Sequence, residues 1–143
     1  MLKKTVRFIA LNNTDATMTY ASGARIVLSY IPWRFDSNGA MYYGTEVTGV
    51  LNTFGTGDTI ATNGSVSGDA QDNSTNLYLG LDGYFSATTD ALSTGTIALY
   101  YEASGQDGWP SEAADAVISE DSTYVIALSF NALSGTKATN FSL

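Results

Sequence analysis

Apolar and polar residues alternate along most of this chain, and a period of two residues is typical of β-strands. The alternation is clearest over residues 124–131, where every second side chain is large and apolar. It recurs in five other stretches, which are residues 6–11, 26–31, 46–51, 77–82 and 97–102. The helical period of 3.6 residues hardly appears. The one candidate helix is Ser111–Val117, which a loop would explain equally well.

Short polar clusters separate the alternating stretches. Several contain Asn-Gly or Asp-Gly pairs, which tolerate positive φ and favour tight turns. These pairs lie at residues 38–39, 63–64, 82–83 and 107–108. Thr53–Thr75 is polar and Gly-rich, and we expect a long loop there around a short strand at Thr59–Ala61. The pattern predicts an all-β, single-domain β-sandwich or jelly-roll-like fold over residues 1–143, with about eight to ten antiparallel strands and little or no helix.

Composition excludes most catalytic chemistry. The chain has no His and no Cys, so it lacks the usual nucleophile–base systems and the usual zinc ligands. A pair of carboxylates could still hydrolyse a glycosidic bond. Glu46 and Glu102 lie in predicted strands and are the candidates, but no spacing selects them. We therefore predict a protein that is not an enzyme, with no catalytic residues and no cofactor.

One polar region carries oxygen ligands of the kind that calcium prefers. Asp58, Asp69, Asp72 and Asn73 lie close together in the sequence. No Asp-x-Asp-x-Asp-Gly loop is present, and Asp and Asn are common in solvated turns. We interpret these residues as turn residues and predict no metal site, while calcium binding at the loop of Asp69 and Asp72 stays open.

Charge is unevenly distributed along the chain. Six basic residues face 14 acidic ones, for a net charge of −8, and no Lys or Arg occurs between Phe35 and Thr136. Such a chain is not expected to bind nucleic acid, which requires a basic patch. The acidic excess could simply favour solubility. Alternatively, the early basic residues could dock on an acidic partner; they are Lys3, Lys4, Arg7, Arg25 and Arg34.

The sequence carries no sign of membrane insertion or export. No apolar run approaches the ~20 residues that a membrane helix requires. The apolar stretch at residues 8–11 is too short for a signal peptide. We expect synthesis in the cytoplasm, without export and without a membrane partner.

Aromatic residues make up 12% of the chain. Trp33 and Trp109 lie next to prolines, and Trp is enriched among interface anchors; the alternative is that each Trp packs on the core of the protein. Neighbouring side chains on a strand point to opposite faces. We therefore expect one Tyr of each adjacent pair to be buried and the other exposed; the pairs are Tyr42–Tyr43 and Tyr100–Tyr101.

The segment from Gly95 to Pro110 reads Gly-Thr-Ile-Ala-Leu-Tyr-Tyr-Glu-Ala-Ser-Gly-Gln-Asp-Gly-Trp-Pro. It resembles a pattern in small virion proteins of tailed bacteriophages, in which such a strand runs into an Asp-Gly turn. A later strand at residues 124–128 and a closing strand with Phe141 extend the resemblance over residues 76–143. The resemblance implies a sandwich or jelly-roll module that decorates capsids or joins tail parts, and it implies no catalytic residue.

These observations lead to one hypothesis and two alternatives. The hypothesis is a capsid decoration (cement) protein of a bacteriophage virion, homo-oligomeric, that binds the major capsid protein or other virion proteins. Its contact residues would be Lys3, Lys4, Arg7, Arg25, Arg34, Trp33 and Trp109. One alternative is a carbohydrate-binding or adhesin-like sandwich that contacts glycans through Trp33, Trp109 and exposed tyrosines. The other is a tail, neck or fibre-associated virion component.

Overall fold

The computed structural model of the protein describes residues 2–104 and 122–143. The described residues form nine strands and one 3-10 turn, η1 (Tyr20–Ser22), so the expectation of an all-β fold is confirmed. The candidate helix Ser111–Val117 lies outside the described residues. The strands are β1 (Thr5–Thr14), β2 (Met18–Thr19), β3 (Arg25–Phe35), β4 (Met41–Tyr43), β5 (Thr59–Ile60), β6 (Ser65–Ser67), β7 (Gln71–Asp72), β8 (Gly80–Ser104) and β9 (Thr123–Ser142).

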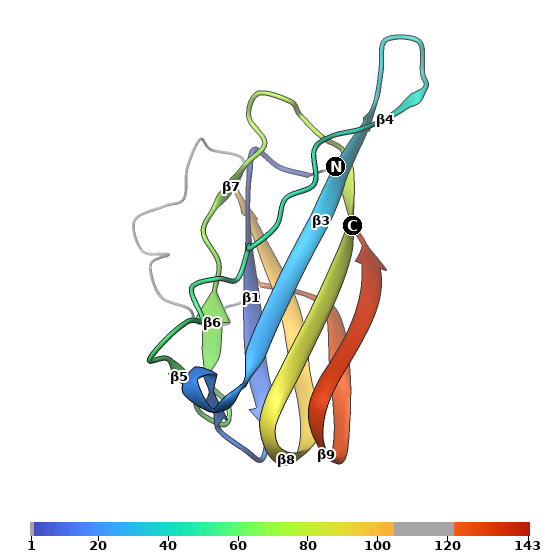
Figure 1. Cartoon of the computed structure of the whole chain (residues 1–143). Helices are drawn as coiled ribbons and strands as arrows, with labels where there is room; N and C mark the ends of the chain where they lie inside the picture. Colours follow the sequence, from blue (N-terminus) through green and yellow to red (C-terminus); the bar gives the residue numbers. More distant parts are fainter. Residues whose placement is uncertain (1, 105–121) are drawn as a thin grey trace.

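The two longest strands form one antiparallel ribbon. β8 has 25 residues and β9 has 20, and they pair from Asp82↔Ser142 to Tyr101↔Thr123. The ribbon folds back on itself near its middle, so that each strand runs down one layer and up the other (Figure 1). β3 pairs with the first half of β8, and β1 pairs with the second half.

Two layers result from this folded ribbon. One layer contains β4, β3, the first half of β8 and the second half of β9. The other contains β6 and β7, then β1, the second half of β8 and the first half of β9. β2 and β5 form a separate pair beside them. All pairings among the described strands are antiparallel, as the sequence predicted.

Irregular backbone produces the bend in the ribbon. The pairing of β8 with β9 shifts register between Thr89 and Ser93, and such bulges bend and twist a strand. Three residues at the bend have left-handed backbone: Gly95 on β8 (φ 113°), and Ala132 (φ 52°) and Gly135 (φ 116°) on β9. The ribbon therefore turns where its backbone departs from regular strand geometry.

The inward faces of the two layers form one hydrophobic core. Phe8 of β1 packs on Tyr30 of β3, with ring centroids 5.8 Å apart, and on Phe141 of β9, at 6.4 Å. Phe85 and Leu28, which are opposite each other in the pairing of β3 with β8, are completely buried. The aromatic contacts join both layers across the core. No helix of the described residues is long and apolar enough to cross a membrane.

Two stretches expected to be strands are wholly or partly irregular. Residues 46–51 form no strand: Val47 makes a single bridge to Tyr30, while Val50 and Leu51 lie in a turn and bury their side chains. The stretch 77–82 alternates in sequence, but β8 begins only at Gly80. Leu77 has left-handed backbone (φ 49°) and is 59% exposed. In both stretches apolar residues alternate in the sequence, but the backbone is not extended throughout.

The region Thr53–Thr75 contains more structure than a loop around one strand. The expected short strand is present as β5, where Ile60 is buried. β6 and β7 follow it, and both pair with the outer edge of β1. With only three and two residues, they are too short to show the alternation that identifies a strand.

A bulge also changes which side chains point outward in the first half of β9. Leu128 and Phe130 are buried as their alternation predicts, but Tyr124 is 56% exposed. The register shifts between Leu99 and Tyr100, which places Tyr124 opposite Tyr100 on the outer face. The two tyrosine rings meet edge to face, with centroids 5.7 Å apart.

Two glycines at the bend provide a matched test of its geometry. Gly95 and Gly135 have nearly the same φ, but a Cβ on Gly95 would collide with the carbonyl oxygen of Asn13, whereas one on Gly135 would meet nothing within 4 Å. Left-handed backbone costs a non-glycine residue about 1–3 kcal/mol. We expect Gly135→Ala to lose about that much stability in urea unfolding. Gly95→Ala should lose about 2 kcal/mol more, because β1 must also move. Equal losses would contradict this account of the bend.

Candidate functional site

The five early basic residues do not form one patch. Lys3 and Lys4 are exposed at the start of the chain. Arg34 lies near the end of β3, whereas Arg25 lies at its beginning, roughly 30 Å away at 3.3 Å per residue. The Arg25 guanidinium donates to the carbonyl oxygens of Tyr20 and Ala24 and lies over the Tyr20 ring. Arg25 therefore belongs to the opposite end of the molecule from Arg34.

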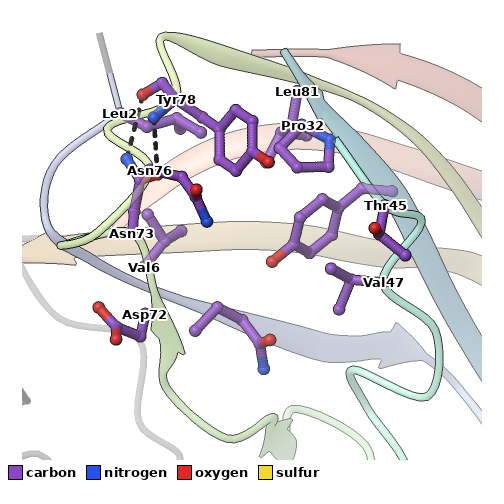
Figure 2. A pocket seen from close by; sticks show the side chains of 12 residues that line it. Leu2, Val6, Pro32, Thr45, Val47, Asp72, Asn73, Asn76, Tyr78 and Leu81 are labelled. Atoms are coloured by element: carbon purple, nitrogen blue, oxygen red, sulfur yellow. Dashed lines mark hydrogen bonds between the residues drawn. The ribbon is translucent and has the colours of Figure 1, made fainter. Parts of the chain in front are cut away.

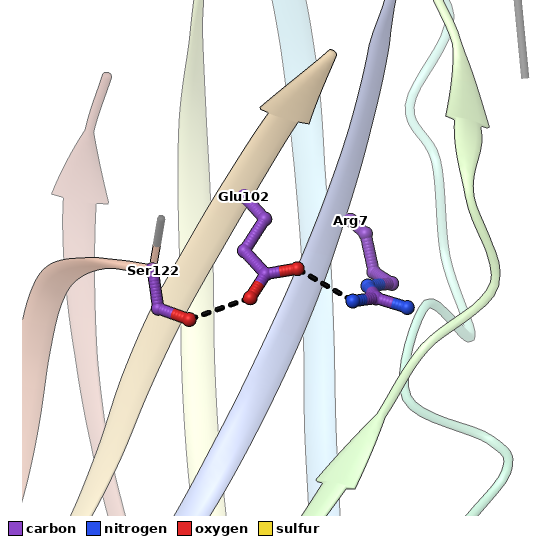
Figure 3. A network of polar contacts seen from close by, with 3 residues as sticks. All are labelled: Arg7, Glu102 and Ser122. Atoms are coloured by element: carbon purple, nitrogen blue, oxygen red, sulfur yellow. Dashed lines mark hydrogen bonds and ion pairs between the residues drawn. The ribbon is translucent and has the colours of Figure 1, made fainter. Parts of the chain in front are cut away.

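Arg7 is buried inside the protein and is not available for docking. Its side chain forms an ion pair with Glu102, with Nη2 2.5 Å from Oε2, and the two side chains are only 8% and 4% exposed. Ser122 donates a hydrogen bond to the other carboxylate oxygen of Glu102, at 2.6 Å (Figure 3). The expectation that Arg7 contacts a partner is therefore wrong. It faces Glu102 because the two residues are opposite each other in the pairing of β1 with β8.

The most exposed apolar surface lies on a hairpin formed by β3 and β4, which we call the arm. β3 pairs with β8 only as far as Trp33↔Gly80, where β8 begins. Arg34 and Phe35 therefore lie beyond β8 and pair only with β4. The arm projects from one end of the two layers (Figure 1).

Side chains on both faces of the arm reach solvent. Phe35, Met41 and Tyr43 share one face and are 49–52% exposed; Tyr42 points to the other face and is 49% exposed. The expectation that one residue of the pair Tyr42–Tyr43 is buried is therefore wrong, because the arm has no second layer beside it. Tyr100 and Tyr101 do point to opposite faces, and Tyr101 packs against the core.

The tip of the arm is ordered by Asp36. Its carboxylate accepts hydrogen bonds from the backbone N–H groups of Asn38 and Ala40, at 2.8 and 2.9 Å. The N–H of Asp36 donates to the Ala40 carbonyl, and Gly39 supplies positive φ (80°). A turn closed by an Asp side chain in this way holds its backbone in one conformation. The apolar side chains beside the tip are therefore held on a preorganised support.

At the root of the arm, Trp33 and Arg34 face opposite sides. Trp33 is half-buried; its ring packs over Gly80 and lies 6.0 Å from the Phe35 ring, nearly perpendicular to it. Arg34 donates to the carbonyl oxygen of Asn76 and lies over the Tyr42 ring, 5.3 Å from its centroid. Trp33 thus packs on β8 and lies beside the exposed apolar face of the arm. Trp109, the other expected anchor, lies outside the described residues.

A cavity of about 230 Å³ opens beside the root of the arm (Figure 2). Its apolar walls come from Val6, Pro32, Val47 and Leu81. The polar groups that line it include Tyr30, Thr45, Gln71, Asp72, Asn76 and Tyr78. The cavity lies between segments that are far apart in the sequence and meet only in the fold.

Asn73 holds one wall of this cavity in place. Its side-chain amide donates to the carbonyl oxygens of Lys3 and Tyr78, and its side-chain oxygen accepts from the Tyr78 N–H at 2.8 Å. Its backbone N–H donates to the Lys4 carbonyl. Asn73 therefore ties the segment before β8 to the start of the chain, and its oxygen is committed to this role.

The acidic residues also have local roles. Asp72 accepts from the backbone N–H of Ser74, a hydrogen bond that lowers the pKa of Asp72 below its usual value. Asp58 accepts from the Gly55 N–H. Within the described residues, no three His, Cys, Asp or Glu side chains gather as a metal site would require.

The two carboxylates considered for glycoside hydrolysis do not form a pair. Glu46 is exposed and lies beside Ile31 and Tyr84 on the outer face of one layer. Glu102 is buried with Arg7 on the outer face of the other layer. Asp82 lines the same surface hollow as Glu46, but Glu46 and Glu102 lie on different layers and do not face each other.

No protein-family model matches this chain, and comparisons with curated proteins and with solved structures also find no match. The functional argument therefore depends on the residues themselves.

Neither the exposed arm nor the cavity was predicted from the sequence. Trp33 and Arg34 of the arm were singled out as contact residues and exposed tyrosines as possible glycan contacts, but the strand was expected to end at residue 31 and no hairpin was predicted at residues 33–43. Its aromatic density on both sides of an Asn-Gly turn could have indicated an exposed hairpin. No local pattern could have shown the cavity, since its walls extend from Leu2 to Leu81.

The burial of Arg7 leads to a prediction about stability. Glu102→Gln removes the charge that faces a buried guanidinium, and removing one member of a buried pair costs about 3–5 kcal/mol. We expect a loss of about 3 kcal/mol in the free energy of unfolding, measured in urea. The double variant Arg7→Met, Glu102→Leu should recover much of it, because it removes both charges of this pair. Unchanged stability of Glu102→Gln would show that the pair is not desolvated.

Proposed function

We propose that this protein is a non-enzymatic structural protein of a bacteriophage virion, most specifically a decoration protein that binds the major capsid protein. The observation that carries the binding role is the arm, where Phe35, Met41, Tyr42 and Tyr43 are all about half exposed. Soluble proteins rarely expose a contiguous group of large apolar side chains unless it contacts a partner. The arm therefore supports a protein that binds by placing these side chains in an apolar groove of its partner.

The arm can supply useful binding energy. Fully burying an apolar side chain of this size contributes about 1.5–3 kcal/mol, and these side chains are already half buried. Three such residues on one face would contribute roughly 3 kcal/mol before the cost of association. The Asp36 turn reduces the conformational entropy that binding must overcome, because the tip is already ordered.

Positive charge near the arm adds a preferred orientation. Lys3 and Lys4 join the segment that Asn73 holds, and Arg34 binds the Asn76 carbonyl of the same segment. Three cations thus lie near one end of a chain whose net charge is −8. Long-range electrostatics would orient this end toward an acidic surface. Arg25, at the far end, does not take part in this contact.

The assignment to a virion is supported by the sequence resemblance over residues 76–143, which includes the second half of β8. A tail, neck or fibre-associated position is the second form of this proposal. Mass spectrometry of purified virions would test both. Many copies per particle would favour decoration, a few copies would favour the tail or neck, and absence from the particle would contradict the virion assignment.

A matched pair of variants on β3 tests the role of the arm. Phe35→Ser and Val27→Ser remove similarly exposed apolar side chains from the same face of one strand, but only Phe35 lies on the arm. We expect Phe35→Ser to weaken binding to capsids stripped of this protein by about tenfold or more, as at an interface anchor. Val27→Ser should bind as the unmodified protein does. Co-sedimentation measures binding, and thermal melts check that both variants fold; equal binding by the two variants would contradict docking through the arm.

Self-assembly is supported by the open edge of the sheet. Among the described strands, β9 pairs only with β8, so its other side offers unpaired backbone groups in both layers. Proteins usually protect such an edge with charges or prolines. β9 contains no Pro and no acidic residue, and Lys137 is its only charge. Two copies of this acidic protein could therefore pair along β9 without bringing carboxylates together.

Charges placed on β9 should prevent this pairing. Ala127→Lys and Ala138→Lys place one charge on each half of the edge strand, which disfavours strand addition. We expect the doubly substituted protein to be monomeric in sedimentation velocity, while the unmodified protein is oligomeric. Ala91→Lys, on exposed β8 at the bend, is the control and should stay oligomeric. Monomeric unmodified protein would contradict self-assembly through β9.

A further inference from the structure

The cavity beside the arm is lined by a tyrosine whose hydroxyl the fold does not use. Tyr30 is only 8% exposed, and its ring packs on Phe8. Its backbone N–H and C=O are both bonded to Val47, but within the described part of the chain its hydroxyl has no hydrogen-bond partner. Tyr30 lines the cavity, and its hydroxyl is available to a molecule placed there.

Burial also determines the chemical form of this hydroxyl. Desolvation raises the pKa of Tyr30 to about 12, so the phenol is neutral at physiological pH and can donate its proton in a hydrogen bond. The amide groups of Gln71 and Asn76 can each donate and accept. The cavity is thus lined by several neutral hydrogen-bonding groups. Figure 2 shows the side chain of Asn76 among them.

The lining disfavours an anion. Of the residues that the structure describes, no Lys or Arg lines the cavity, whereas Asp72 does. Because the Ser74 hydrogen bond lowers the pKa of Asp72, its carboxylate is charged at neutral pH. The carboxylate can accept hydrogen bonds from hydroxyl groups but would repel a negative ligand.

Size and shape restrict the ligand further. The volume of about 230 Å³ exceeds that of cavities of roughly 150 Å³ that hold a benzene ring. It can therefore hold one six-membered ring with substituents. Val6, Pro32, Val47 and Leu81 form an apolar surface against which such a ring can lie.

We infer that this cavity binds a single neutral pyranose unit of a glycan, with its ring against the apolar wall and its hydroxyls bonded to Tyr30, Asn76 and Asp72. Ligand sites commonly combine an apolar lining with a few convergent polar groups in this way. The site is separate from Trp33 and from the exposed tyrosines of the arm, which the sequence singled out for glycan contact. It does not depend on the virion assignment, because a sugar could be recognised on any surface.

The test uses the full chain and a panel of glucose, galactose, mannose and N-acetylglucosamine. We expect saturable NMR shifts of backbone amides at residues 30–33 and 71–78 for at least one sugar, with a Kd on the order of millimolar. Glucuronate should bind more weakly than glucose because Asp72 is charged. No saturable shift with any sugar of the panel would overturn the inference and leave water as the occupant of the cavity.

Matched variants locate the binding. Tyr30→Phe removes only the hydroxyl and should weaken binding about fivefold, the effect of one hydrogen bond. Asn76→Ala leaves the carbonyl that Arg34 uses and should also weaken binding. Tyr84→Phe, a similarly conservative change at an exposed tyrosine outside this cavity, should have no effect. If Tyr30→Phe and Asn76→Ala bind as well as Tyr84→Phe, the sugar binds elsewhere and the inference is wrong.

Discussion

The bend in the β8–β9 ribbon is the constraint on which the rest of the structure depends. A straight strand of 25 residues would extend for roughly 80 Å, which is too long for one layer of a protein of this size. The ribbon instead turns back at Gly95 and Gly135, where left-handed backbone is tolerated. Its two halves become the centres of two layers, and β3 and β1 each add to a different half. The common core lies between them.

The candidate binding region follows from the same arrangement. β8 begins opposite Trp33, so β3 continues past the end of its partner and forms the arm with β4. The cavity opens beside this point, where the segment before β8 is tied by Asn73 to the start of β1. β9 lies at the far edge of both layers because it is the outer strand of the folded ribbon. Arm, cavity and open edge are thus three consequences of where one ribbon begins, bends and ends.

Local sequence pattern predicted strands well where the backbone is regular. The core positions Phe8, Ile97 and Leu128 follow from alternation and are buried. Prediction failed where a bulge or a left-handed residue interrupts the period. Tyr124 faces outward because of a one-residue register shift, and Leu77 is exposed in an irregular segment. Alternation assumes extended backbone, and it contains no information about where that assumption stops.

The sequence by itself determined that the fold is all-β, that the chain is strongly acidic, and that His and Cys chemistry is absent. These properties depend on composition and on neighbouring residues. Only the tertiary structure decided that Arg7 is buried while Lys3 and Lys4 are exposed, and that Arg25 and Arg34 lie at opposite ends. The partner of Arg7 lies 95 residues away in the sequence. Contacts at such separations arise from strand pairing and layer packing, so no local pattern of charge or hydrophobicity could reveal which residues remain on the surface.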